Sequence, residues 1–185
     1  MTCTGGTLRE DRGLLFLLCW DMKRYRIGMY GGKFLPLHKG HGYCIDVAAN
    51  ECETVYALLF WGGADEEKIL REFPYVWLSH EERMNHLLTI AGHYHNVIAE
   101  EIDISALRKI DGSEDWDAET PLVRKICGGR LDAVYSSEES YSEYFARAYP
   151  EAVHRLVDVG RVHFPISGTI IRNMNSEEER QKWRI

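Results

Sequence analysis

The stretch GGKFLPLHKGH, residues 31–41, decides the fold, because it joins a strand-type run at 25–30 to the helix-type run that follows it. A helix that begins directly after a strand presents unpaired backbone N–H groups and a partial positive charge beyond the sheet edge. His38 and His41 are three residues apart, so both imidazoles should project from the first helical turn as donors. Glycines let a polyphosphate approach the backbone closely. The stretch predicts a phosphate-binding loop, to which we assign Gly31, Gly32, Lys33, Phe34, Lys39 and Gly40.

A surface pair and a zinc site are weaker interpretations of the two histidines. A lone HxxH pair is more often a coincidence of a helix surface, but here it is coupled to a glycine-containing loop and to a second motif near the other end of the chain. A zinc site is disfavoured, because helical metal sites usually use i, i+4 spacing and need further ligands, and none stands nearby in the sequence. We therefore assign no metal-ligating residues.

The second motif is ISGTIIR, residues 166–172, about 125 residues after the first. Ser167 is suited to cap a helix N-terminus, Gly168 allows close approach, and Thr169 offers a hydroxyl and a backbone N–H. Arg172 lies three residues further on, so its guanidinium should face the same way and bind phosphate with two parallel donors. The motif predicts a second phosphate-binding turn.

Strand-type and helix-type runs alternate along the chain. Apolar, β-branched runs predict strands at 25–30, 54–61, 97–102, 132–136 and 153–159, and helical spacing or capping signals predict helices at 40–51, from 79, at 121–127, at 141–149 and from 167. This alternation is typical of an α/β fold, a Rossmann-like doubly wound parallel sheet of about five strands. Ligands of such sheets bind at the switch point, outside the carboxyl ends of the strands, where the loops after strands one, four and five should converge.

Composition limits the class of protein. A chain of 185 residues is most simply one domain, which we place at 22–185, with 1–21 an extension of unknown role. A formal charge of -7 without clustered cations argues against nucleic-acid binding. The apolar run 14–20 is too short for the roughly 18 residues of a membrane span and lacks a cleavage site. Alternatively, this run packs as an edge element or at a contact between subunits of a homo-oligomer.

The cysteines indicate a reducing compartment. There are five of them, at positions 3, 19, 44, 52 and 127, an odd count with no CxxC pair. Reduced thiols in a cytoplasmic protein are the natural interpretation.

Taken together, the two motifs resemble the (H/T)xGH and ISxTxxR signatures of the nucleotidyltransferase superfamily. Three stretches are similar to NadR-type nicotinamide mononucleotide adenylyltransferases: the GKFLPLHKGH loop, DWD at 115–117, and DAVYSSEESYSEYFARAY at 132–149. The chain has no GxxxxGK[ST] motif and no helix-turn-helix pattern before the core, so kinase and repressor activities are not expected. The polar RNMNSEEERQKW segment leaves the docking of the last helix open.

The resemblance implies adenylyl transfer from ATP, with Mg²⁺, to nicotinamide mononucleotide, which gives NAD and pyrophosphate. It implies that His41 acts at the α-phosphate, that His38 with Lys33 or Lys39 acts at the other phosphates, and that Thr169 and Arg172 hold the β and γ phosphates. The catalytic assignment is His38, His41 and Arg172, and Ser167, Gly168 and Thr169 join the nucleotide-binding set.

The acceptor assignments are Trp116, Asp117 and Arg83. An indole is a good partner for a flat pyridinium cation, although Trp116 is also interpretable as a packing residue. Asp117 is equally suited to a carboxamide or to a helix start, and Arg83 to the acceptor phosphate or to a solvated face. Two alternatives remain: another acceptor (phosphopantetheine, nicotinate mononucleotide or, with CTP, a polyol phosphate), or a non-catalytic nucleotide-sensing domain.

Overall fold

The computed structural model describes residues 23–185. The expected extension at 1–21, with its apolar run, lies outside the described residues, as do two of the five cysteines. The other three, Cys44, Cys52 and Cys127, are free and buried.

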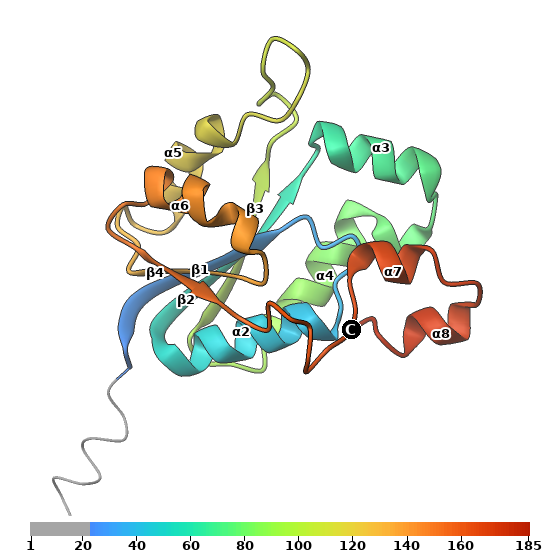
Figure 1. Ribbon diagram of the computed structural model, residues 1–185, viewed down its shortest axis with the longest axis horizontal. Helices are drawn as coiled ribbons and strands as arrows, with labels where there is room; N and C mark the ends of the chain where they lie inside the picture. The colour runs from blue at the N-terminus through green and yellow to red at the C-terminus, as the bar shows by residue number, and fades with distance from the viewer. Residues whose placement is uncertain (1–22) are drawn as a thin grey trace, which may run out of the picture.

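A five-stranded parallel sheet forms the centre of the fold (Figure 1). Its strands are β1 (Tyr25–Gly32), β2 (Cys52–Trp61), β3 (Val97–Asp103), β4 (Ala133–Ser136) and β5 (Val153–Leu156), in the order β3-β2-β1-β4-β5. Every neighbouring pair is parallel. The winding direction reverses between β1 and β4, which makes the carboxyl end of β1 the switch point. The prediction of a Rossmann-like doubly wound sheet is confirmed.

Helices cover both faces of the sheet. On one face α2 (Lys39–Glu51) and α4 (His80–Ala91) pack against side chains such as Val55, Leu59 and Tyr135. On the other face α5 (Trp116–Ile126) and α6 (Ser142–Ala148) pack against side chains such as Leu58 and Val134. Leu58 and Leu59 alternate between these two cores, and both are fully buried. A strand buried on both faces explains why β2 is apolar throughout.

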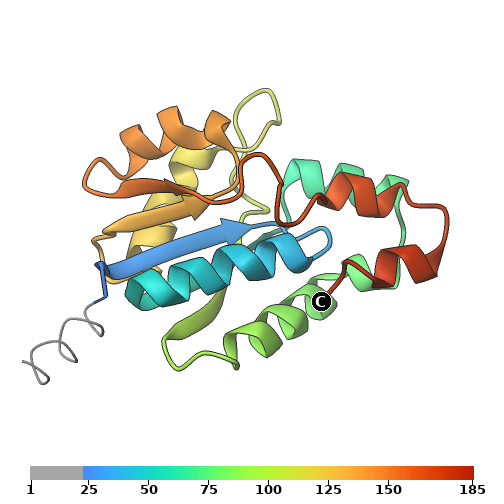
Figure 2. The ribbon, with the colours of Figure 1, turned by 60° about the horizontal axis from the view of Figure 1, so that its bottom comes forward.

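Further short elements lie beyond the carboxyl ends of the strands (Figure 2). They are α3 (Ala64–Glu72), the 3₁₀ turn η1 (Val76–Leu78), α7 (Gly168–Arg172) and α8 (Glu177–Gln181), and a second 3₁₀ turn, η2 (Glu139–Tyr141), precedes α6. The sequence pattern did not predict α3, because it lacks an apolar stripe and no side chain caps its start. The single last helix expected from Ser167 is in fact two short helices, α7 and α8.

The start of α5 differs from the predicted start at Pro121. Asp115 caps the helix, since its side chain accepts a hydrogen bond from the Ala118 amide, and helical structure begins at Trp116. Pro121 therefore lies inside the helix, where it is exposed and removes one backbone hydrogen bond. This earlier start places the first turn of α5, with Trp116, beside the switch point.

Within residues 23–185, no helix combines the length and the apolar character that crossing a membrane requires.

Candidate active site

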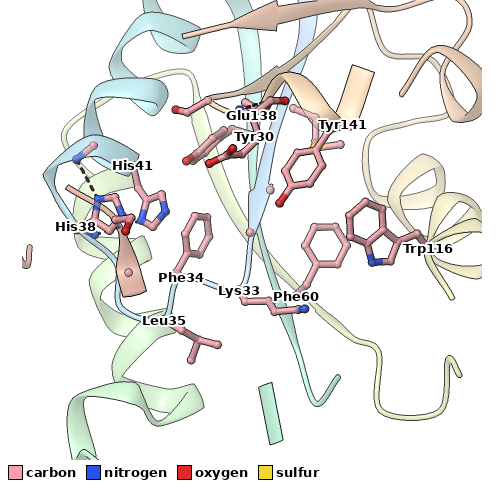
Figure 3. Close-up of a pocket in the computed structure, with 18 of the residues that line it drawn as sticks. Tyr30, Lys33, Phe34, Leu35, His38, His41, Phe60, Trp116, Glu138 and Tyr141 are labelled. Atoms are coloured by element: carbon pink, nitrogen blue, oxygen red, sulfur yellow. Dashed lines mark hydrogen bonds between the residues drawn. The ribbon is translucent and has the colours of Figure 1, made fainter. Parts of the chain in front are cut away.

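A cavity of about 520 Å³ opens at the carboxyl end of β1 (Figure 3). It extends from the start of α2, where His38 and His41 lie, to the start of α5, where Trp116 lies. Both predicted motifs contribute to its wall: Gly31, Gly32, Lys33, Phe34 and Gly40 from the first, and Ser167, Gly168, Thr169 and Arg172 from the second. The structure thus brings together two segments that are about 125 residues apart in the sequence.

The two histidines cap the start of α2 reciprocally. His38 is the N-cap residue, and its Nδ1 accepts a hydrogen bond from the Gly40 amide at 3.2 Å. The His38 amide in turn donates to Nδ1 of His41 at 3.3 Å. The rings stack with centroids 3.7 Å apart. Because each Nδ1 is an acceptor, each neutral ring carries its proton on Nε2. Both rings line the cavity, so the histidines supply two neutral donors there.

Burial keeps these rings neutral. Burial, with a smaller contribution from the nearby Arg161, lowers the pKa of His38 to about 4. Burial also lowers the pKa of His41 well below its usual value, and His38 and Arg161 act in the same direction. Two neighbouring neutral imidazoles beside a guanidinium can donate hydrogen bonds to an anion, whose negative charge would favour their protonation.

Two buried arginines hold the loop between β1 and α2. Arg83 donates to the carbonyl of Lys33 at 2.5 Å, and Arg172 donates to the carbonyl of Leu35. Between these carbonyls Phe34 has a positive φ of 49°, a conformation that side chains rarely adopt without support from their surroundings. The guanidiniums therefore fix the backbone that presents the predicted phosphate loop to the cavity.

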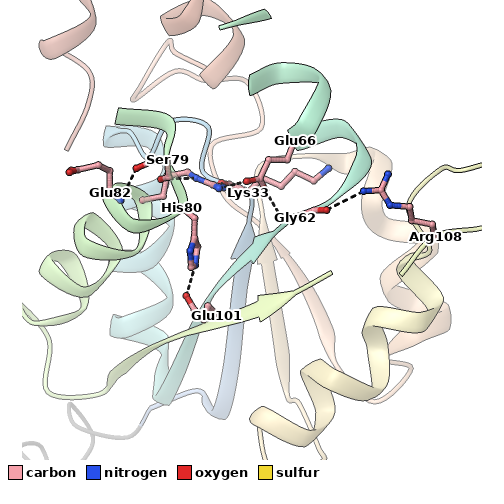
Figure 4. Close-up of polar contacts among 9 residues, drawn as sticks. Lys33, Gly62, Glu66, Ser79, His80, Glu82, Glu101 and Arg108 are labelled. Carbon is pink, nitrogen blue, oxygen red and sulfur yellow. Dashed lines mark hydrogen bonds and ion pairs between the residues drawn. The ribbon is translucent and has the colours of Figure 1, made fainter. Parts of the chain in front are cut away.

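The position of Arg83 gives no support to the acceptor-phosphate role expected for it, and the alternative of a solvated face is wrong. Its side chain is 0% exposed and forms an ion pair with Glu66 of α3, itself 5% exposed (Figure 4). Arg83 does not line the cavity. The helix α3, which carries Glu66, was not predicted, so a partner for the guanidinium could not be expected from the sequence. Ser79 caps α4 as predicted, by accepting from the Glu82 amide.

Arg172 lies in the cavity wall, but some of its guanidinium N–H donors already bind protein atoms. Besides the Leu35 carbonyl, it donates to Oγ1 of Thr169 at 3.2 Å, and its guanidinium lies 5.5 Å from the centre of the Phe73 ring. Ser167 caps α7 as predicted. Gly168 is required for a different reason from the one expected, because a Cβ there would lie 2.6 Å from the Leu35 carbonyl oxygen. Gly168 thus permits contact between the two motifs themselves.

Trp116 forms the opposite end of the cavity, as Figure 3 shows. The residue is 37% exposed, and its ring forms T-shaped contacts with the rings of Tyr141 and Tyr144, whose centroids lie 5.4 and 5.2 Å away. Its Nε1 donates to Glu114 at 3.4 Å, and Lys33 forms an ion pair with Glu114 at 2.7 Å. A partly exposed indole in the cavity wall can stack on a flat ligand.

Two further expectations are corrected by position. Asp117 lies on the outer side of α5, where it pairs with Arg147 at 2.8 Å, and it does not line the cavity. Lys39 is exposed and also lies outside the cavity. The helical period explains the position of Asp117, because one residue beyond Trp116 points about 100° away from it.

Sequence reasoning missed several cavity residues, and the charged side chains of Arg161 and Glu119 are among them. Arg161 follows β5 and donates to the carbonyl of Ile166 at 2.8 Å, and it pairs with Glu138 at 2.5 Å. Its loop is organised by Asp158, whose carboxylate accepts from three successive amides at 162–164. A lone arginine in a loop carries no signal in the sequence.

The chain end docks on the start of α2, which settles the question left open by its polar sequence. The Lys39 amide donates to the carbonyl of Trp183 at 2.9 Å, and Arg184 lies 4.4 Å from the centre of the Trp77 ring. One of the free amides expected at this helix start is therefore already paired, and the histidine side chains become the principal donors.

The chain resembles proteins of NAD biosynthesis. No family model matches it. Over 154 residues, 79% of this chain, it is 27% identical to the trifunctional NAD biosynthesis/regulator protein NadR of Escherichia coli (strain K12), of which it covers 36%. NadR in complex with NAD and AMP-PNP matches with a TM-score of 0.62 at 22% identity, over 86% of this chain and 44% of that one.

A bifunctional NMN adenylyltransferase/ADP ribose pyrophosphatase from Francisella tularensis matches with a TM-score of 0.56 at 21% identity, over 80% of this chain and 41% of that one. The chain therefore spans less than half the length of each of these proteins. The expected resemblance to NadR and the expected fold are both confirmed.

Proposed function

We propose that this chain is an adenylyltransferase that transfers AMP from ATP to nicotinamide mononucleotide, giving NAD and pyrophosphate. The observation that carries the proposal is that one cavity joins two phosphate-binding motifs at one end to an aromatic ring at the other. The similarity to NadR supports the same activity.

The reaction needs positioning more than it needs a reactive side chain. The 5′-phosphate of the acceptor is already anionic and attacks the α-phosphorus of ATP in line, while pyrophosphate leaves. No general base is required. His41 donates to the α-phosphate, where negative charge rearranges, and His38 and Lys33 contact the neighbouring phosphates. Thr169 and Arg172 hold the β and γ phosphates and then the leaving pyrophosphate.

Mg²⁺ would accompany ATP in this proposal, held by the triphosphate, because the described residues contain no group of three or more histidine, cysteine or carboxylate side chains that could hold the ion. It would supply charge compensation to the triphosphate. Arg161 adds a cation beside the histidines, from the loop after β5.

Trp116 is proposed to stack on the pyridinium ring of the acceptor. It lies across the cavity from the histidines, and its indole is the side chain best suited to a flat cation. This placement separates the two substrates: phosphates of ATP at α2 and α7, and the acceptor ring at α5.

The experiment is a measurement of pyrophosphate release from ATP and Mg²⁺ with a panel of acceptors. The panel contains nicotinamide mononucleotide, nicotinate mononucleotide and phosphopantetheine, and a parallel set replaces ATP by CTP with a polyol phosphate. We expect release with ATP and nicotinamide mononucleotide, and NAD as the product. If pyrophosphate is released only with another acceptor, the chain is still a nucleotidyltransferase, but nicotinamide mononucleotide is not its acceptor. Tight binding of ATP without release in any reaction would indicate a nucleotide-sensing domain.

A further inference from the structure

Glu119 is a carboxyl group without a partner in the cavity wall. It lies on α5 three residues after Trp116, so both side chains point from the same side of the helix. Its Oε1 is shielded from solvent and has no hydrogen-bond partner within the described residues. Buried polar atoms of folded proteins are nearly always hydrogen-bonded, so this oxygen is available to a ligand that enters beside Trp116.

The groups around Glu119 favour its neutral form. Burial, the negative charge of Glu114 and, to a smaller extent, that of Asp115 together raise the pKa of Glu119 to about 7, against the opposing charge of Lys33. Lys33 is paired with Glu114 at 2.7 Å, so the nearest cation is shared with another carboxylate. From α6, Tyr144 also faces this region, but burial raises its pKa above its usual value of 10.0, so it does not titrate near neutrality.

We propose that Glu119 is the residue that distinguishes a nicotinamide ring from a nicotinate ring in this cavity. The inference deepens the proposed function and rests on it. A carboxamide offers both a donor and an acceptor, so it pairs with Glu119 whether the carboxyl is protonated or ionised. A nicotinate carboxylate offers acceptors only. It pairs with the protonated acid but is repelled by the ionised one, in a partly buried site where repulsion is weakly screened.

This difference predicts that the preference for the nicotinamide acceptor depends on pH through the ionisation of Glu119. As pH rises through about 7, Glu119 ionises. Selection against nicotinate should therefore strengthen, while use of the nicotinamide substrate should change little. Burial lowers the pKa of each histidine in the free protein, and any protonation that bound ATP favours is common to both acceptors, so it cancels in their ratio. The ring substituent of nicotinate stays ionised throughout, and the 5′-phosphate is common to both acceptors, so its titration cancels in their ratio.

The test is the ratio of kcat/KM for nicotinamide mononucleotide to that for nicotinate mononucleotide, measured between about pH 6 and about pH 8.5. For the unchanged protein we expect the ratio to rise about tenfold or more over this range. Glu119→Gln has nearly the same shape, cannot ionise and can donate to a carboxylate, so its ratio should be lower at high pH and should not vary with pH. A ratio that is flat in the unchanged protein, or profiles that run parallel in the two proteins, would overturn the inference.

Glu143→Gln is the matched control. It removes one negative charge from the first turn of α6, where the side chain is exposed and does not line the cavity. Its ratio should follow that of the unchanged protein. If Glu143→Gln abolishes the pH dependence as Glu119→Gln does, general charge and not a specific contact sets the ratio, and the assignment fails. If Glu119→Gln does not fold, the profile of the unchanged protein alone still decides.

Calorimetric binding of the two mononucleotides without ATP separates this inference from the proposed function. Binding that discriminates in the predicted way, with no turnover, overturns the adenylyltransferase activity but keeps the role of Glu119. Turnover with a flat ratio overturns the role of Glu119 but keeps the activity. If the chain neither binds nor turns over either mononucleotide, both fail.

Discussion

The stacked histidines are the residues whose geometry is most closely tied to the proposed chemistry. Each uses Nδ1 for the backbone at the start of α2 and keeps Nε2 as a donor for the cavity. His41 lies at the third position of the helix, and His38 at the cap. The same hydrogen bonds that begin the helix therefore orient the rings.

At the scale of this residue, we predict that His41→Ala lowers kcat about 10² to 10³-fold, the usual effect of removing one preorganised donor. The change is to be measured by pyrophosphate release at saturating ATP and acceptor, with circular dichroism as a check of folding. A variant that keeps more than about a third of the original kcat would contradict the assignment.

Arg172→Lys should be nearly as damaging to kcat as Arg172→Ala. A lysine cannot donate simultaneously to the Leu35 carbonyl and to Thr169, nor present a planar fork to pyrophosphate. Because the guanidinium also joins the two motifs, both variants should lower the thermal midpoint, which a purely ligand-binding residue would leave unchanged. Recovery of most of the activity in the lysine variant would show that charge alone matters.

Trp116→Ala should raise KM for nicotinamide mononucleotide about tenfold, which corresponds to about 1 to 2 kcal/mol of lost stacking, with little change in KM for ATP. The residue is 37% exposed, so removal of its ring should cost little packing. Steady-state kinetics with each substrate varied in turn give the two KM values. Equal changes in both KM values, or no change in either, would make Trp116 a packing residue.

At the scale of elements, the ion pair between Arg83 of α4 and Glu66 of α3 connects two helices to the phosphate loop. Glu66 also accepts from the Gly62 amide at 3.0 Å, and Arg83 holds the Lys33 carbonyl. Pairs of this kind contribute little relative to apolar packing, but the loss of one partner leaves a buried charge without compensation.

We therefore predict that Arg83→Met lowers the free energy of unfolding by about 3 to 5 kcal/mol. The double variant Arg83→Met with Glu66→Gln should recover part of this loss, because no unpaired charge remains and the amide oxygen can still accept from Gly62. Urea denaturation measures the unchanged protein, both single variants and the double variant, and Arg71→Met, at an exposed site on α3, is the control. A double variant less stable than the sum of its single changes would contradict this account.

At the scale of the whole molecule, the histidine cap connects the active site to the stability of the fold. His38 has a pKa of about 4 in the folded protein against 6.5 as its ordinary value. Between these values the unfolded chain binds a proton that the folded chain does not, so stability is lost as pH falls from 6.5 towards 4. The raised pKa of Glu119 makes the folded protein more stable as pH falls through this range, so it partly cancels the effect of His38. The contribution of His38 must therefore be measured as a difference between the unchanged protein and a variant without this histidine.

His38→Thr keeps a helix-capping oxygen and removes the titrating ring. We predict that the stability of the unchanged protein falls between about pH 7 and about pH 4.5 by about 2 kcal/mol more than the stability of this variant. Urea midpoints at the two pH values give the difference. An equal fall in both proteins would show that His38 is not buried in its neutral form.

The sequence by itself determined the parts of this protein that depend on neighbours along the chain. The caps at His38 and Ser167, the alternation of strands and helices, and the two motifs are encoded within a few residues, since capping and periodicity are local. From these the Rossmann-like fold and the two motifs at one end of the cavity could be predicted. The Asp115 cap encodes the start of α5 in the same local way, although Pro121 by itself favours a later start.

Only the tertiary structure decided which charged groups face one another. The contact from Arg172 to Leu35 joins residues 137 apart, and that from Arg83 to Lys33 joins residues 50 apart. Whether an arginine or a glutamate is solvated, paired or free in a cavity depends on what packs against it, and packing is not local. For this reason the sequence does not reveal that Arg83 is buried against Glu66, and Arg161 and Glu119 become cavity residues only because the sheet brings their loops and helices together.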